Sequence, residues 1–317
     1  MVLSEIARRY ALDESVVEQA VELARRTLVP KTRDISVKEM GRTRVLRVIR
    51  RGFGSLLLDL DNQRQCPACK VSVPPGRFCA QCGAQLEHES HHCRDCKTTL
   101  REGSDSCANC GTPAGMVRFY HYDFEIADEW VKYSVLIKSP LADDFTPTIF
   151  PAGPIRLRID SGCETGQLFG DATCECRDQL FEALRRIAEY GNGLVINIPR
   201  QDGRGMGLPF KLATLLLQRD LGVDTHESGA LLEPNAARDL RTFSGALAIL
   251  AFWGASSDTP LEVFTNNPKK LAALSSSGYT NVTPIPIAIE PNRFTEHHLR
   301  AKQEQFGHTN LVPSKKS

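Results

Sequence analysis

The sequence has few features of a membrane or secreted protein. No stretch reaches roughly 18 uninterrupted apolar residues, the length that a transmembrane helix needs. The first ten residues, MVLSEIARRY, contain no apolar core of signal-peptide length. We therefore expect a cytoplasmic protein without a membrane partner.

The sequence also lacks a charge excess of one sign. Its 39 Lys and Arg oppose 38 Asp and Glu, for a net charge of +1, so any attraction to phosphate must come from local clusters. With 317 residues, of which 41% are hydrophobic, the chain fits more than one globular domain. We expect a helical hairpin with a basic β segment at 1–60, a double zinc ribbon at 61–115 and a catalytic domain at 116–317.

The predicted N-terminal segment allows two interpretations of each of its parts. Apolar residues at helical spacing within 3–27, with Asp13 as an N-cap, indicate two helices that form either a DNA-binding helix-turn-helix or, as we favour, a plain hairpin. Residues 31–51 contain eight Lys or Arg and two acids, which could bind phosphates. The same residues suit a strand with a solvated basic face, followed by a turn at Gly52 and Gly54.

Eight of the eleven cysteines form two similar units of paired CxxC motifs. The units are Cys66, Cys69, Cys79 and Cys82, then Cys93, Cys96, Cys107 and Cys110. Four thiolates close a tetrahedral zinc shell, so two structural zinc ions are expected; disulfides are the less favoured alternative. Closed shells serve docking to a protein or nucleic-acid partner, and a single aromatic residue between the pairs, Phe78, weakens a base-stacking role.

Beyond residue 155 the chain alternates between two hydrophobic periods. Strand-like runs at Ile155–Ile159, Gly193–Ile198 and Leu261–Phe264 alternate with helical runs at Asp178–Tyr190, Leu208–Leu221 and Asp239–Phe252. The aromatic and β-branched residues of 117–150 predict further strands. This pattern indicates an α/β (α+β) domain.

The remaining cysteines, Cys163, Cys174 and Cys176, could hold a catalytic zinc ion. On a strand, Cys174 and Cys176 would point to one side, and Cys163 would complete a three-sulfur base that leaves one position open for water. The alternative is that all three are buried core thiols. The H-x-E and P-C-x-x-C signature of nucleobase deaminases is absent.

The surrounding motifs resemble those of GTP cyclohydrolase II. They are Cys163-x-Thr-Gly-x-x-Phe-Gly with Cys174-x-Cys176 and Gln179, the run Pro199–Leu208, the run Thr265–Lys270, and the ending with Asn292, Glu296, His297, Lys302, Gly307 and His308. This resemblance covers about half of the chain.

The resemblance implies a homodimeric enzyme that uses zinc and Mg²⁺ to open the imidazole ring of GTP, releasing formate and pyrophosphate for riboflavin synthesis. It implies Cys163, Cys174 and Cys176 as ligands of the catalytic zinc, and Arg238 as the arginine that attacks the α-phosphate. By position, the residues that match the substrate-binding set are Arg158, Gln179, Asp202, Gly203, Arg204, Thr225, Thr265 and Lys270.

Several positions depart from the family pattern. Leu215 replaces a tyrosine and Ala236 an aspartate that serves as proton acceptor. Asp160 and Gly162 replace a histidine and a glutamate, and Asp202 a glutamate. We therefore expect a divergent paralogue that performs part of the reaction or accepts another purine nucleotide. The alternatives are a catalytically impaired nucleotide-binding regulatory protein and a nucleic-acid adaptor built from residues 1–116.

Overall fold

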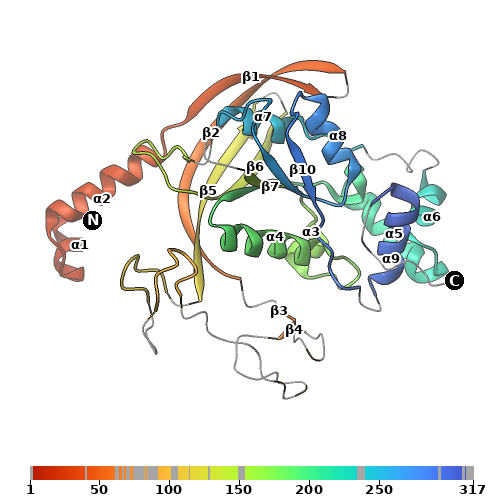
Figure 1. Ribbon diagram of the computed structural model, residues 1–317, viewed down its shortest axis with the longest axis horizontal. Coiled ribbons are helices and arrows are strands. Elements are labelled where there is room, and N and C mark those ends of the chain that lie inside the picture. Colours follow the sequence, from red (N-terminus) through yellow and green to blue (C-terminus); the bar gives the residue numbers. More distant parts are fainter. Residues whose placement is uncertain are drawn as a thin grey trace.

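A central eight-stranded sheet organises the computed structural model (Figure 1). The structure describes residues 3–39, 41–60, 64–65, 68, 72–73, 82, 84, 92–100, 106–113, 115–127, 129–148, 154–233, 240–291, 294–308 and 311. The strand order is β1-β2-β5-β6-β8-β7-β9-β10, and a separate two-stranded ribbon pairs β3 (Arg64–Gln65) with β4 (Ser72–Val73).

One half of the sheet is antiparallel and the other half is parallel. The antiparallel half consists of β1 (Lys31–Glu39), β2 (Arg42–Asp59), β5 (Met116–Ile126) and β6 (Val131–Lys138). The parallel half consists of β8 (Gly193–Ile198), β7 (Ile155–Ser161), β9 (Leu261–Phe264) and β10 (Val282–Ile285). The basic N-terminal segment and the predicted catalytic domain thus share a sheet, while the domain boundaries stay a prediction.

The expected turn at Gly52 and Gly54 is wrong, because β2 continues through both glycines. The pairing of β2 with β5 shifts register between Arg50 and Gly52, which marks a β-bulge. Glycine is tolerated inside a strand where a bulge bends it. A long strand therefore replaces the strand and turn that the sequence predicts.

Helices cover both faces of the sheet. One face packs against α7 (Ser244–Phe252) and α8 (Pro268–Ser276), and the other against α4 (Cys176–Tyr190) (Figure 1). Because side chains alternate along a strand, Leu157 and Ile159 of β7 point into the hydrophobic core between the sheet and the helices α7 and α8. Arg158 and Asp160 consequently point to the opposite side, and Arg158 lines a pocket beyond the end of the strand.

The other helices gather around the parallel half of the sheet. They are α3 (Glu164–Phe169), the short 3-10 helix η1 (Asp202–Gly205), α5 (Leu208–Leu221), α6 (Thr225–Leu232) and α9 (Glu296–Phe306). The helical run expected from Asp239 begins only at Ser244. Two backbone N–H groups before this helix donate to acceptors in other parts of the chain. Leu240 N donates to Arg204 O, and Phe243 N donates to the Glu39 carboxylate.

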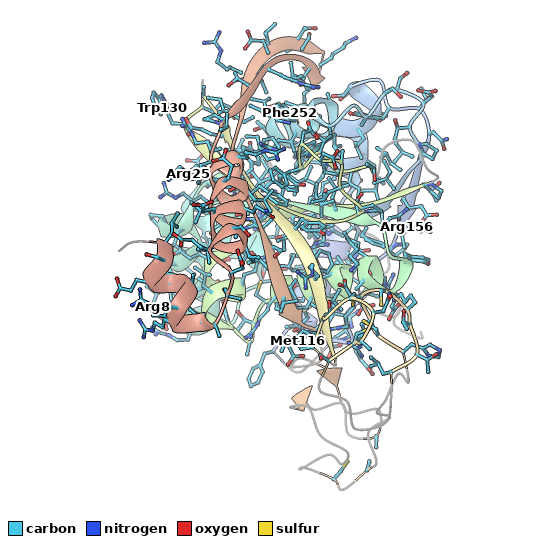
Figure 2. All side chains as sticks on the ribbon, turned by 90° about the vertical axis from the view of Figure 1, so that its left-hand side faces the viewer. Arg8, Arg25, Met116, Trp130, Arg156 and Phe252 are labelled. Carbon is cyan, nitrogen blue, oxygen red and sulfur yellow. The ribbon has the colours of Figure 1, made fainter. Side chains whose placement is uncertain are left out.

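The N-terminal helices α1 (Leu3–Tyr10) and α2 (Glu14–Thr27) form a hairpin at one end of the sheet, with Arg8 at its outer end (Figure 2). Helix α2 begins after Asp13, whose carboxylate accepts a hydrogen bond from Ser15 N. Among the described helices, none has the length and apolar character that a membrane crossing requires.

The basic stretch of 31–51 is largely neutralised within the protein. Its ion pairs are Lys31–Asp144, Arg44–Glu129, Arg47–Asp34 and Arg51–Glu125. Arg33 donates to Phe252 O and lies over its ring, and Arg50 is buried. These contacts favour the interpretation of a basic strand face over a phosphate-binding patch.

Candidate active site

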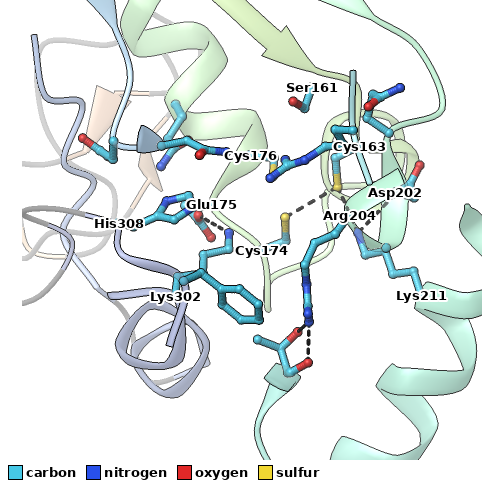
Figure 3. Close-up of a pocket in the computed structure, with 18 of the residues that line it drawn as sticks. Ser161, Cys163, Cys174, Glu175, Cys176, Asp202, Arg204, Lys211, Lys302 and His308 are labelled. Carbon is cyan, nitrogen blue, oxygen red and sulfur yellow. Dashed lines mark hydrogen bonds and ion pairs between the residues drawn. The ribbon is translucent and has the colours of Figure 1, made fainter. Parts of the chain in front are cut away.

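A pocket of about 340 Å³ lies where three parallel strands end. The chain leaves β7 towards Cys163, β8 towards Asp202 and β9 towards Thr265, and all three residues line the pocket (Figure 3). In sheets with parallel strands, ligands bind beyond the carboxyl ends of the strands. Short loops from neighbouring strands thereby bring together residues that are far apart in the sequence.

Three cysteines meet at one wall of this pocket. The Sγ atoms of Cys163, Cys174 and Cys176 all lie within 4.8 Å of one another, and the Cys163–Cys174 separation is 3.6 Å. Cys163 is the N-cap of α3 and Cys176 the first residue of α4, so the expected strand geometry is wrong. Cys174 N instead donates to Asp171 O in a turn. Cys163 is buried, while Cys174 and Cys176 are half-buried, so these are not simply core thiols.

Two glycines beside the cysteines have no room for a side chain. A Cβ atom at Gly166 would lie 3.0 Å from Cys174 Sγ and 3.2 Å from Cys163 Sγ. At Gly162 it would lie 2.7 Å from the carbonyl oxygen of Ile198, so a side chain there would require the backbone to move. Three soft donors on one side, with the pocket on the other, fit an ion that keeps one position open.

Two buried cations lie beside the sulfurs. Arg158 pairs with Asp160, whose Oδ1 accepts from Nη2 at 2.8 Å and from Nε at 2.9 Å. Lys270 donates to Ile159 O at 2.6 Å. Burial, and then the charge of Arg158, lower the pKa of Lys270 to about 7. Such a desolvated amine gains from an anionic ligand.

A third cation, Arg204, is held by two helices. It stands in a strained loop in which Gly203 and Arg204 both have left-handed backbones, with φ of 57° and 59°. Its guanidinium donates to Thr225 O at 2.5 Å and lies 4.2 Å from the ring centroid of Phe306. Helices α6 and α9 therefore fix the direction in which Arg204 enters the pocket (Figure 3).

The C-terminal helix also reaches the cysteine loop. Lys302 of α9 forms a 2.6 Å ion pair with Glu175, the buried residue between two of the cysteines. His308 lies beside this pair (Figure 3). Burial, and then the positive charge of Lys302, lower the pKa of His308 to about 3, so its imidazole is neutral near pH 7.

Lys211 was not selected from the sequence, yet it contacts the triad. Its Nζ lies 2.9 Å from Cys163 Sγ and 3.4 Å from Asp202 Oδ1, and it donates to Thr165 Oγ1. A signal was present: Lys211, Thr214 and Gln218 form a polar stripe at helical spacing on the leucine-rich α5, and all three line the pocket.

The pocket contains every predicted substrate-binding residue. Its lining includes Arg158, Gln179, Asp202, Gly203, Arg204, Thr225, Thr265 and Lys270. Leu215 also lines it. Asp160 instead lies behind the lining and accepts hydrogen bonds from Gln167 and Asn197. Arg238 and Ala236 lie outside the described residues.

A second cluster of cysteines has a different geometry. The Sγ atoms of Cys93, Cys96, Cys107 and Cys110 all lie within 4.8 Å of one another. Each CxxC pair forms the same turn: Cys93 N donates to Thr98 O and Lys97 N to Cys93 O, and corresponding bonds join Cys107, Gly111 and Thr112. Cys66, Cys69 and Cys79 of the first unit lie outside the described residues, and Cys82 is exposed.

The second unit docks on the sheet through Asp95. Its carboxylate pairs with Lys138 of β6 and accepts from Thr112 Oγ1 at 2.8 Å and from Arg118 N at 3.3 Å. Although burial opposes it, these hydrogen bonds hold the pKa of Asp95 below its ordinary value. Lys97 donates to Ala188 O near the end of α4, the helix that begins at Cys176.

Comparison with known proteins places this architecture in a family. The family model described as GTP cyclohydrolase II matches residues 105–286. A riboflavin biosynthesis protein RibBA of Phocaeicola vulgatus is 39% identical over 156 residues, or 49% of this chain and 37% of that protein. The matched part thus spans just over a third of such RibBA relatives.

Shorter relatives are matched over most of their length. GTP cyclohydrolase-2 of Picrophilus torridus is 38% identical over 154 residues, which are 49% of this chain and 77% of that protein. The protein of the same name in Histophilus somni is 34% identical over 185 residues, which are 58% of this chain and 79% of that protein. The chain belongs to the GTP cyclohydrolase II family.

Proposed function

We propose that this protein hydrolyses a purine nucleotide related to GTP at a zinc ion held by Cys163, Cys174 and Cys176. One observation carries the proposal: the three sulfurs face the same pocket as Arg158, Arg204 and Lys270. Three ligands and an open fourth position are typical of catalytic zinc. Cations around the same space suit a polyphosphate.

The chain's own residues would bind and orient the nucleotide. Arg158 and Lys270 are fixed by Asp160 and Ile159 O, and Arg204 by Thr225 and Phe306. Such fixed groups lose little freedom when a substrate arrives. When bound, zinc supplies a Lewis acid that lowers the pKa of a coordinated water. Mg²⁺ would accompany the phosphates, as the family resemblance implies.

The departures from the family pattern limit the reaction that we propose. Leu215 lines the pocket and can neither donate a hydrogen bond nor relay a proton. Ala236 stands where the family has its proton acceptor, and alanine is not a base. Loss of one positioned acid or base typically costs about 10² to 10⁴ in rate. We therefore propose partial chemistry, imidazole ring opening or pyrophosphate release, rather than the whole route to the riboflavin precursor.

Mass spectrometry of a nucleotide panel tests this function. The protein is incubated with GTP, GDP, ATP and ITP, and formate, pyrophosphate and the purine absorbance are followed. We expect turnover of a guanine or hypoxanthine nucleotide, which Cys176→Ser abolishes while the variant stays folded. No product from any nucleotide, or equal turnover by the variant, would end the proposal.

Metal content provides an independent test. We propose three zinc ions per chain, one in the open three-sulfur cluster and two in the closed four-sulfur units. Elemental analysis of the purified protein should give three, and Cys176→Ser should give two. A parent protein with two zinc ions, both retained in Cys176→Ser, would leave the open cluster without metal and remove the basis of the chemistry.

A second candidate function is nucleotide sensing. The apolar Leu215 in the pocket favours it, because binding needs the cations but not a proton relay. The cysteine units would then pass the nucleotide-bound state to a protein or nucleic-acid partner. Tight GTP binding without any product would favour the sensor. A homodimer, implied by the family resemblance, suits either function and can be tested by sedimentation.

A further inference from the structure

We propose that Lys211 is a positioning residue of the open cluster, donating an N–H···S hydrogen bond to Cys163 and offsetting the charge of the three thiolates. The inference deepens the proposed function and rests on the metal proposed there. Its basis is the contact between Lys211 Nζ and Cys163 Sγ at 2.9 Å (Figure 3). The lysine side chain is only 14% exposed.

The lysine is held in place by two other elements of the chain, α3 and η1. Thr165 Oγ1, in the first turn of α3, accepts from Nζ, and Asp202 Oδ1 lies 3.4 Å away. Asp202 is itself buried and accepts from Glu164 N at 3.2 Å through each oxygen. Asp202 thus connects the lysine of α5 to the N-terminus of α3, where Cys163 is the N-cap.

Cys163 is singled out among the cysteines. The hydrogen bonds found within the described chain give no cationic donor to the sulfurs of Cys174 or Cys176, and the nearby Lys302 is engaged by Glu175. At the closed cluster, too, the nearby lysine has other acceptors: Lys97 donates to the carbonyl oxygens of Arg94 and Ala188. Cys96 there contacts the neutral Thr98. The cationic contact therefore accompanies the cluster with an open position.

The chemistry explains why an open site gains from such a contact. Three thiolates and Zn²⁺ carry a net charge of −1, which repels a polyphosphate, and Lys211 offsets part of that charge while it also pairs with Asp202. An N–H donor also draws electron density from the thiolate, so the metal keeps more of its Lewis acidity at the open position. A closed structural site performs no chemistry and needs neither effect. Loss of such an outer partner typically costs about 10- to 100-fold in activity or affinity.

Cobalt spectroscopy tests the hydrogen bond directly. Co²⁺ is loaded into the open cluster while the closed units keep zinc, with one cobalt per chain verified by elemental analysis. Hydrogen bonding stabilises the sulfur lone pairs, so in Lys211→Met the sulfur-to-cobalt charge-transfer bands should move to longer wavelength. Lys211→Arg should restore the parent spectrum, and Lys211→Gln, with a neutral donor, should lie between. With zinc, kcat of Lys211→Met should fall about 10- to 100-fold.

A matched control separates this role from substrate binding. Lys269 is exposed and lines the same pocket, so Lys269→Met also removes one positive charge but should leave the cobalt bands unchanged. A parent spectrum in Lys211→Met, with a raised KM alone, would overturn the inference and make Lys211 a substrate contact. If Lys211→Met does not fold, the Gln and Arg variants decide by the same bands. A parent protein that takes up no cobalt outside the closed units would instead overturn the proposed metal site itself.

Discussion

The two described cysteine clusters present the same donor atom, a cysteine sulfur, in two different arrangements. Cys93, Cys96, Cys107 and Cys110 come from two equivalent turns, and their four sulfurs can surround an ion completely. Cys163, Cys174 and Cys176 come from two helix starts and a turn, and their three sulfurs leave one side to the pocket. Both clusters offer cysteine sulfur, so the number of sulfurs and the residues around them distinguish a structural metal site from a catalytic one.

The surroundings differ as much as the ligand number. Asp95 fixes the closed cluster to the sheet through a buried ion pair with Lys138. Around the open cluster, Lys270 has a backbone carbonyl as its hydrogen-bond partner. Asp95 and Lys138 neutralise each other at the closed cluster, whereas the hydrogen-bond partner of Lys270 at the open cluster is uncharged. The following changes test that contrast.

Removing one sulfur from each cluster should have the largest effect and the clearest difference. Cys174→Ser removes one of the three sulfurs proposed to hold the catalytic zinc, so nucleotide turnover should be lost as in Cys176→Ser, with little change in thermal stability. Cys107→Ser should lose one structural zinc and unfold the turns around it, while turnover per folded molecule stays close to the parent. Equal losses of turnover in two folded variants would contradict the division of roles.

Breaking the ion pair between Asp95 and Lys138 should have the next largest effect, which is on the free energy of unfolding. The side chains of Asp95 and Lys138 are each only 11% exposed, so Asp95→Ala leaves a buried charge without its partner. We expect a loss of about 3 to 5 kcal/mol in the free energy of unfolding in urea. The control is Asp34→Ala, whose ion pair with Arg47 is exposed and should contribute at most about 1 kcal/mol. Similar losses in both variants would show that Asp95 is not a docking residue.

A methyl group behind the open cluster should have a smaller effect. In Gly166→Ala the new Cβ would meet Cys174 Sγ at 3.0 Å, and such overpacking costs about 1 to 3 kcal/mol. We expect this cost as weaker zinc affinity of the open cluster, measured by competition with a chelator. Gly54→Ala, where no atom lies within 4 Å, should leave it unchanged. Unaltered affinity in Gly166→Ala would mean that the sulfurs can shift freely.

Sequence patterns predicted the parallel strands that lead to the open cluster. The predicted runs at Gly193–Ile198 and Leu261–Phe264 match β8 and β9, and the run at Ile155–Ile159 lies within β7, because apolar and β-branched residues recur along each run. The resemblance to GTP cyclohydrolase II selected residues that line one pocket. Parallel strands explain this success, since residues that follow their carboxyl ends converge without any detailed pairing information.

Long-range pairings could not be predicted in the same way. The contacts of Asp95 with Lys138 and of Arg204 with Phe306 join elements far apart in the chain, and no local pattern specifies them. Gly52 and Gly54 were misinterpreted because a bulge and a turn have the same local composition. The strand assigned to Cys174 and Cys176 failed because a helix start also brings neighbouring residues together.

The charge of Lys270, beside the open cluster, should make nucleotide binding depend on pH. Lys138, beside the closed cluster, should not affect that binding. Burial, and then Arg158, lower the pKa of Lys270 to about 7, so the free protein loses this positive charge as pH rises above 7. A bound phosphate favours the ammonium and raises that pKa, so binding takes up a proton. The dissociation constant of a non-hydrolysable GTP analogue should therefore rise by up to tenfold per pH unit from about pH 7.5. Calorimetry between pH 7.5 and 9 measures this dissociation constant. Lys270→Arg keeps its charge throughout that range and should flatten the dependence on pH. A parent protein with constant affinity would show that Lys270 does not bind the phosphates.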